Sequence, residues 1–207
     1  MNIEFPAKKF EFKITPIEPI ILPLYKGSTL RGGFGNAFRR VVCALKKNDC
    51  GECILKEKCV YSYIFETPPP SDTKIMRKYT SAPHPFILEP PPEKKRGYTP
   101  KDEITFGLTL IGKAVDYLPY FVYTFDELGR MGIGKGRGKY ELKTVRTNPT
   151  LKRGAGGIFR KKTMGSFIHL IQRPLSHLSR QVCHSHESGN PVQMLILKAS
   201  HRLAPAR

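Results

Sequence analysis

Residues 103–112 alternate between apolar and polar side chains over ten positions, and this pattern constrains the fold more than any other feature of the chain. Side chains of a strand point to opposite faces in turn, so the apolar half of such a segment shares one buried face. Residues 8–15 alternate in the same way, with Phe10, Phe12 and Ile14 on one side. Both segments therefore predict strands of a sheet that has one covered face.

Each of these strands is followed by a segment with helical spacing of its apolar residues. The first predicted helix begins at Ser28 or Thr29, either of which can cap it. Its apolar residues fall on one stripe, made of Leu30, Phe34, Ala37, Phe38, Val41 and Leu45. The second predicted helix covers residues 117–128, and Gly129 is expected to end it.

Shorter runs at 61–65, 86–88 and 139–147 complete the set of predicted strands. The order is then strand, helix, two or three strands, helix, strand. This order is typical of the ferredoxin-like split βαβ fold, an α+β arrangement of helices on an antiparallel sheet. Residues 1–148 are expected to form this domain. RNA-recognition domains built on the same plan contact single-stranded bases through the sheet or its loops.

The chain is strongly basic, with a formal net charge of +18. Such a charge favours nucleic acid or an anionic membrane surface as partner. The apolar runs are much shorter than the roughly 20 residues that a membrane-spanning helix needs. The first residues show no charged and apolar leader pattern, which predicts a cytoplasmic protein with no membrane partner.

Residues 149–207 differ from the rest of the chain in composition. They contain ten Lys and Arg against one acidic residue and show little periodicity. This composition indicates a basic tail that is either disordered and RNA-binding or aberrant. The string at 184–191 resembles translated interspersed bacterial repeats, which favours an interrupted reading frame.

Five glycines lie within residues 129–138, and cationic residues alternate with them. Glycine allows positive φ and exposes backbone amides, so a loop that mixes the two suits phosphate groups. We therefore expect an RNA-binding loop at Gly134, Lys135, Gly136, Arg137 and Lys139, with a flexible surface turn as the alternative.

Three arginines of the first predicted helix lie off its apolar stripe: Arg31, Arg39 and Arg40. They are RNA-binding candidates as well, unless they belong to a solvated helix face.

Four cysteines fall within 17 residues, spaced as Cys43-x6-Cys50-x2-Cys53-x5-Cys59. The x2 pair can hold one metal ion across a tight turn, and four thiolates suit a structural zinc site. An iron–sulfur cluster would use the same ligands. Disulfides are the competing interpretation, and Cys43 could be a core residue instead.

Three motifs resemble those of a known family: residues 22–40, the cysteine cluster running into 61–66, and residues 119–138. They are similar to the N-terminal part of the CRISPR-associated endoribonucleases that process precursor CRISPR RNA, members of the RAMP superfamily. The resemblance implies tandem ferredoxin-like domains, recognition of CRISPR repeat RNA and association with other CRISPR-associated proteins. It also implies cleavage by the ribose 2′-hydroxyl with no metal or other catalytic cofactor.

The chain departs from this family in two respects. It has no histidine before His84, so Tyr25 and Lys26, just ahead of the first helix, are the remaining catalytic candidates. The family pattern also stops near residue 148, as expected for a truncated protein. The alternatives are a non-catalytic RAMP subunit that holds guide RNA in an effector complex, and a zinc-stabilised interaction module.

Overall fold

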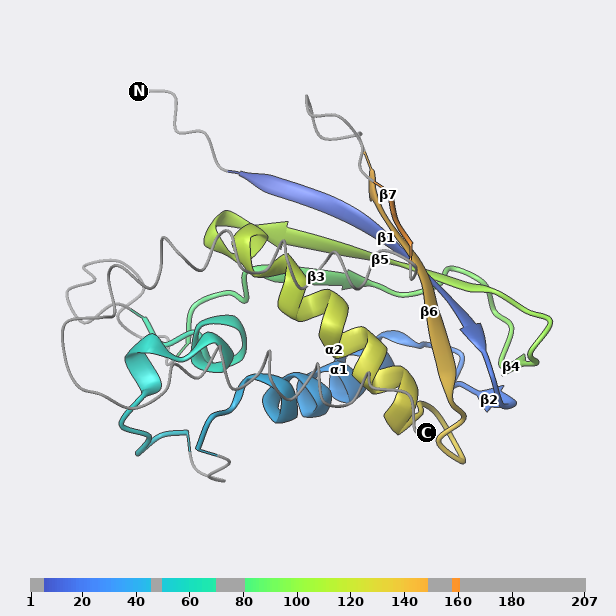
Figure 1. Cartoon of the computed structure of the whole chain (residues 1–207), viewed down its shortest axis with the longest axis horizontal. Coiled ribbons are helices and arrows are strands. Elements are labelled where there is room, and N and C mark those ends of the chain that lie inside the picture. The colour runs from blue at the N-terminus through green and yellow to red at the C-terminus, as the bar shows by residue number, and fades with distance from the viewer. Residues whose placement is uncertain (1–5, 46–49, 70–80, 149–157, 161–207) are drawn as a thin grey trace, which may run out of the picture. The chain divides into compact units, whose positions relative to one another are not determined.

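The computed structural model of the chain describes residues 6–45, 50–69, 81–148 and 158–160. Its centre is an antiparallel sheet in which each strand pairs with its spatial neighbour (Figure 1). In spatial order the strands are β3 (Phe86–Glu89), β5 (Ile104–Ile111), β1 (Ala7–Pro16), β6 (Tyr140–Asn148) and β7 (Ile158–Arg160).

Two helices, α1 (Gly27–Val42) and α2 (Leu118–Met131), cover one face of this sheet (Figure 1). A 3-10 turn, η3 (Gly112–Tyr117), leads from β5 into α2. The chain order β1-α1-β3-β5-α2-β6 with the spatial order β6-β1-β5-β3 is the split βαβ arrangement. The predicted α+β, ferredoxin-like fold is therefore confirmed. Within the described ranges, no helix is long and apolar enough to cross a membrane.

Phenylalanine rings connect the sheet with both helices in the core. Phe12 of β1 lies opposite Phe106 of β5, and both rings come within 4.9 Å of Phe125 on α2. Phe125 in turn lies 4.8 Å from Phe34 on α1. Because aromatic pairs bury a large apolar area, this chain of rings fixes both helices against the sheet. The predicted stripe of α1 is buried from Leu30 to Val41, whereas Leu45 lies beyond the helix.

The uncovered face of the sheet is mostly polar, with Ile87 of β3 exposed on it, and the lysines of β1 there are paired with acidic residues. Lys9, Glu11 and Lys13 of β1 line it, and the two lysines form ion pairs with Glu89 and Glu103. Strands β1, β3, β5 and β6, the last as far as Thr147, place no aromatic side chain on this face. Stacking of bases on the sheet, as in RNA-recognition domains, therefore lacks a platform here.

The strand predicted at residues 61–65 is wrong. This segment forms a π-helical turn, η2 (Ser62–Glu66), which buries Ile64. The rings of Tyr61 and Phe65 stack 5.4 Å apart. In a strand these two residues would lie roughly 13 Å apart, so the turn is what allows the stack.

Both predicted helix boundaries need correction. The N-cap of α1 is Lys26, with no side-chain cap, so neither Ser28 nor Thr29 begins the helix. Helix α2 runs past Gly129 to Met131, and its C-cap is Gly132, whose φ is 81°. Gly129 serves packing instead, because a Cβ there would lie 2.4 Å from the Tyr140 carbonyl oxygen.

The described sheet includes one strand beyond residue 148, because the backbone of β7 pairs with β6. Apart from residues 158–160, the predicted tail lies outside the described residues.

Candidate nucleic-acid interface

Three segments distant in sequence form a small ribbon beside the main sheet. Strands β2 (Ile20–Ile21) and β4 (Gly97–Tyr98) pair antiparallel, and Leu22 N–H donates to the Arg96 carbonyl at 2.8 Å. The glycine loop joins the other side of β2, where Lys135 N–H donates to the Ile21 carbonyl at 2.9 Å. At strand spacing, the ribbon is about 10 Å wide.

The glycine loop is closely packed against this ribbon and is not a loose surface turn. Gly134 has φ of 73°, and a Cβ on it would lie 2.2 Å from the Ile21 carbonyl oxygen. A Cβ on Gly138 would lie 2.3 Å from the Pro19 carbonyl oxygen. These glycines let two backbones touch, a role that the predicted phosphate nest did not include.

The cations of the glycine loop differ in availability. Lys135 and Arg137 are exposed, and neither forms an ion pair with another described residue. Lys139 instead lies 3.2 Å from Glu18, and this hydrogen bond lowers the pKa of the Glu18 carboxyl. Lys135 and Arg137 are therefore the free positive charges of this loop.

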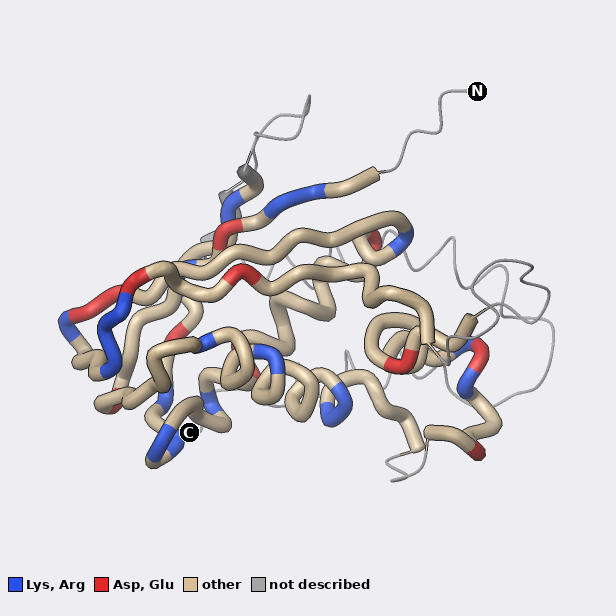
Figure 2. The backbone as a smooth tube through the Cα atoms, turned by 180° about the vertical axis from the view of Figure 1, so that it is seen from behind, with Lys and Arg blue, Asp and Glu red and all other residues tan. Residues whose placement is uncertain are grey.

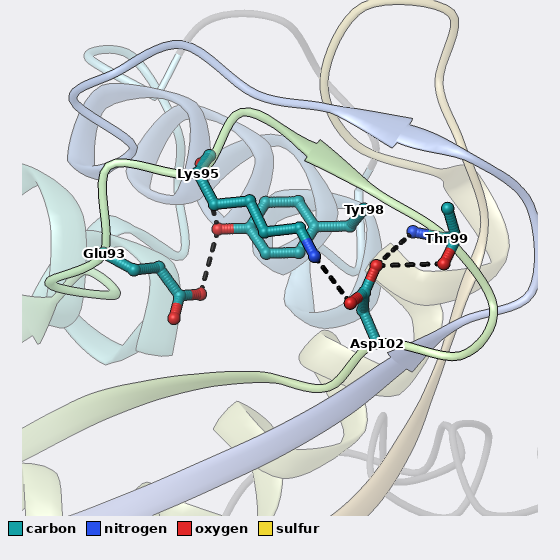
Figure 3. Close-up of polar contacts among 5 residues, drawn as sticks. All are labelled: Glu93, Lys95, Tyr98, Thr99 and Asp102. Carbon is teal, nitrogen blue, oxygen red and sulfur yellow. Dashed lines mark hydrogen bonds and ion pairs between the residues drawn. The ribbon is translucent and has the colours of Figure 1, made fainter.

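A polar network holds the loop that precedes and follows β4 (Figure 3). Tyr98 Oη donates to Glu93 Oε1 at 3.0 Å, and Lys95 Nζ lies 2.6 Å from Asp102 Oδ1. Asp102 also accepts hydrogen bonds from the backbone and hydroxyl of Thr99. The Lys95 and Thr99 donors lower the pKa of Asp102 to about 2. The charge of Lys95 is thus neutralised within the loop.

The neighbours of Lys95 are free of such partners. Lys94 and Arg96 are exposed, and the structure gives them no ion pair within the ranges it describes. We call Lys94, Arg96, Lys135 and Arg137, with the exposed Ile21 and Tyr25 beside them, the basic ledge. Figure 2 shows Lys and Arg segments gathered at this end of the fold. Lys94 and Arg96 were not among the predicted site residues, although their basic run is visible in the sequence.

Tyr25 presents an aromatic ring beside the cations of the ledge. The residue is 70% exposed, and its ring lies over Gly27, where a Cβ would come 2.5 Å from Tyr25 Oη. Ile21 and Leu24 are also exposed nearby. A flat ring among free cations can stack with a base while the cations bind phosphates.

Lys26 lies inside the fold. The residue is 1% exposed, and its Nζ donates to the Glu93 carbonyl at 2.5 Å and to the Leu24 carbonyl at 3.4 Å. These bonds tie the loop before β4 to the start of α1, because the carbonyls of Glu93 and Leu24, the chain neighbours of Lys94 and Tyr25, share one donor. The geometry gives Lys26 a positioning role, and its catalytic role stays a prediction.

Replacing Lys26 by methionine should lower the free energy of unfolding by about 1–3 kcal/mol, because the Leu24 and Glu93 carbonyls lose the hydrogen bonds from its buried amino group. Urea denaturation followed by circular dichroism measures this change. The matched control is Lys94→Met, whose exposed side chain should contribute less than about 0.5 kcal/mol. Equal stabilities of the two variants would show that Lys26 does not hold the loops together.

Two of the predicted arginines of α1 contact aromatic rings of β3 and of the insertion between α1 and β3. The Arg31 guanidinium lies 5.3 Å from the centre of the Phe86 ring, and that of Arg39 lies 5.6 Å from Tyr61. Arg40 is exposed. The structure therefore does not bring Arg31 and Arg39 to the ledge.

His84 is the one histidine within the described residues, and it also belongs to the insertion. Its ring contacts those of Phe65 and Phe86. Burial, and then the charge of Arg31, lower the pKa of His84, while a hydrogen bond with the Ile64 backbone opposes them. The ledge itself holds no histidine.

The four predicted metal ligands are free, half-buried thiols. Burial raises the pKa of the Cys50 thiol; Arg39 opposes this, and Cys43 and Cys59 add to it. Cys43 and Cys59 thus each lie within electrostatic range of Cys50. Across the described part of the chain, no three His, Cys, Asp or Glu side chains are already arranged to hold a metal ion.

Comparison with known proteins places this fold in a family. A protein of Archaeoglobus fulgidus, described as uncharacterized, is 31% identical over 124 residues, which are 60% of this chain and 40% of the relative. The chain thus spans about two fifths of that relative's length. A similar solved structure is a Csm3–Csm4 subcomplex of a type III-A CRISPR–Cas interference complex, with a TM-score of 0.40 and 17% sequence identity. The match covers 74% of this chain and 88% of the chain in that structure. The AF_1859_N model, described as an N-terminal domain, matches residues 5–172, so the chain belongs to the AF_1859_N family.

Proposed function

We propose that this domain binds single-stranded RNA along the basic ledge. The observation that carries the proposal is the meeting of Lys94, Arg96, Lys135 and Arg137, all exposed and without ion pairs among the described residues. Cations that neutralise phosphates supply most of the affinity of such contacts. The open sheet face offers no comparable site, because its lysines are already paired with glutamates.

A single strand fits the ledge better than a duplex. The ribbon is narrow, about 10 Å across. It carries an exposed ring at Tyr25 and exposed aliphatic groups at Ile21 and Leu24. Unstacked bases can bind these groups, whereas the bases of a duplex are already stacked on one another.

The finer proposal is that the RNA is a CRISPR repeat and that the protein takes part in processing it. Its support is that two segments with the family resemblance, 22–40 and 119–138, meet at the ledge. In the reaction, the ribose 2′-hydroxyl attacks the adjacent phosphate, the 5′-oxygen leaves with a proton, and a 2′,3′-cyclic phosphate forms. Tyr25 is our candidate for the proton transfer because its hydroxyl is exposed at the ledge, and Arg96 or Lys135 would stabilise the phosphorane.

A non-catalytic role in holding RNA is the second candidate. The specific observation in its favour is that the ledge has no histidine and that Lys26 is buried. Incubation of end-labelled repeat RNA with the protein in EDTA separates the two. Cleavage that a 2′-deoxy substitution abolishes would identify an endoribonuclease, whereas intact bound RNA would favour the holding role.

Removing three ledge charges together, Arg96→Ala with Lys135→Ala and Arg137→Ala, should weaken RNA binding strongly. For a single strand, each lost phosphate contact reduces the slope of log K against log salt concentration by about 0.7. The slope of the triple variant should therefore be smaller by about 2. Fluorescence anisotropy of a labelled RNA at several salt concentrations measures both quantities.

The matched control removes the same charge from the open sheet face, as Lys9→Ala with Lys13→Ala and Arg146→Ala. Its affinity should stay close to that of the parent apart from a weak long-range effect. Equal losses in both variants would mean that net charge alone drives binding and that the ledge is not the site. No RNA binding by the parent at low salt would contradict the proposal as a whole and favour the interaction module.

A further inference from the structure

The segment from Cys43 to Tyr61 joins α1 to η2 without contributing a buried residue within its described positions. Its turns include one short 3-10 helix, η1 (Lys56–Lys58), which has no buried side chain. Ile54 at its tip is 86% exposed. Each residue held in one conformation costs roughly 1–2 kcal/mol of backbone entropy, and apolar burial is the usual compensation. Val60 and Tyr61, at the end of the segment, pack against the core, but residues 50–58 do not, so this part needs another kind of cross-link to hold one conformation.

The thiols lie at the two ends and in the middle of this segment, where a cross-link would restrain it. Cys43 ends α1, and its N–H donates to the Arg39 carbonyl at 3.0 Å. Cys59 begins the next packed turn, with its carbonyl accepting from Tyr63 N–H at 3.0 Å. Cys50 and Cys53 lie in the turn between these two fixed points, so a link among the four would close the whole segment.

We propose that Cys43, Cys50, Cys53 and Cys59 bind one zinc ion. This ion would cross-link residues 43–61 to the end of α1. Four thiolates satisfy a tetrahedral structural zinc site completely. Residues 46–49, between the first two ligands, lie outside the described residues, and zinc would draw the 50–53 turn toward Cys43 and Cys59. The site is separate from the ledge and does not depend on RNA binding.

The surroundings suit a negatively charged metal centre. Four thiolates and one zinc ion carry a net charge of −2, and the Arg39 guanidinium lies within electrostatic range of Cys50. Lys56 and Lys58 lie three and five residues after Cys53.

Elemental analysis of the full chain after gel filtration should find about one zinc per molecule. Cys53→Ser should lose most of the metal, and its control is Cys183→Ser, which removes the fifth cysteine and should retain it. Absence of metal from the parent, or full zinc in Cys53→Ser, would overturn the four-thiolate site. Bound iron with visible absorption would overturn zinc in favour of a cluster.

Limited trypsin digestion gives a second readout that does not require the variants to be equally stable. A chelator should raise the rate of cleavage after Lys56 or Lys58 at least tenfold, because the metal-free segment opens. Cleavage after Lys101, in the Thr99–Asp102 turn on the far side of the fold, should not change. An equal increase in cleavage rate at Lys101 and at Lys56 or Lys58 would mean that the chelator unfolds the whole domain. An unchanged cleavage rate at Lys56 and Lys58 would refute the role of the metal as a cross-link.

Discussion

Replacing Phe34 by alanine is expected to lower the free energy of unfolding by about 3–5 kcal/mol. The Phe34 ring is fully buried and lies within 5.8 Å of five other rings. These rings come from both helices, the insertion and β3, namely Phe38, Phe65, Phe86, Phe121 and Phe125. The total free energy of unfolding of a domain of this size is about 5–15 kcal/mol, so this loss is a large part of its stability.

The expected result has a matched control in Tyr63→Ala. Tyr63 is also aromatic and contacts the Tyr117 ring at 5.8 Å, but it is 36% exposed. Its loss should be about 1 kcal/mol. Urea denaturation of both variants, with the slope compared as well as the midpoint, gives the two free energies. Similar losses would show that the aromatic core is not centred on Phe34.

The strands and helices could be predicted from the sequence because each has one buried face. The alternation at 103–112 and the stripe from Leu30 to Val41 record that burial directly. The ends of the helices could not be predicted in the same way, because tertiary contacts decide them. Lys26 begins α1 because its ammonium is held by two carbonyls, and Gly129 continues α2 because β6 lies against it.

The candidate site was predictable only in part. The basic glycine loop and Tyr25 are visible as local patterns. Strands β2 and β4 have two residues each, which is too short for any periodic signal. Their pairing, which brings Arg96 to the glycine loop, depends on contacts across about 75 residues of sequence. The sequence also could not show that Lys95 and Lys139 are already paired with carboxylates.

The glycine loop allows a test that separates backbone conformation from close packing. The phosphate-nest prediction treats Gly134 and Gly136 alike, but the structure distinguishes them. Gly136 has φ of 85° and open space around its Cβ position, whereas Gly138 has negative φ and touches the Pro19 carbonyl. Gly134 combines a φ of 73° with contact to the Ile21 carbonyl.

Alanine at these positions should therefore have graded effects. Gly136→Ala should cost about 1–2 kcal/mol for left-handed backbone, and Gly138→Ala about 1–3 kcal/mol for the displaced backbone. Gly134→Ala should combine both costs, at about 2–5 kcal/mol. Thermal and urea unfolding of the three variants measure this series.

RNA affinity should be measured well below the melting temperature of each variant. It should depend on whether the glycine loop keeps its contact with β2 and not on the free energy of unfolding of the variant. In Gly134→Ala the added Cβ should push Lys135 away from Ile21. Lys135 and Arg137 would then no longer lie beside Arg96 on the same ribbon. RNA affinity should fall about tenfold or more, because one or more phosphate contacts are lost. Gly136→Ala leaves the path of the loop intact and should bind within about twofold of the parent, because no charge and no phosphate contact is removed. If Gly136→Ala weakens binding as much as Gly134→Ala, exposed amides of the loop hold the phosphate directly. Affinity that is unchanged in Gly134→Ala would show that the ribbon does not align the cations for RNA.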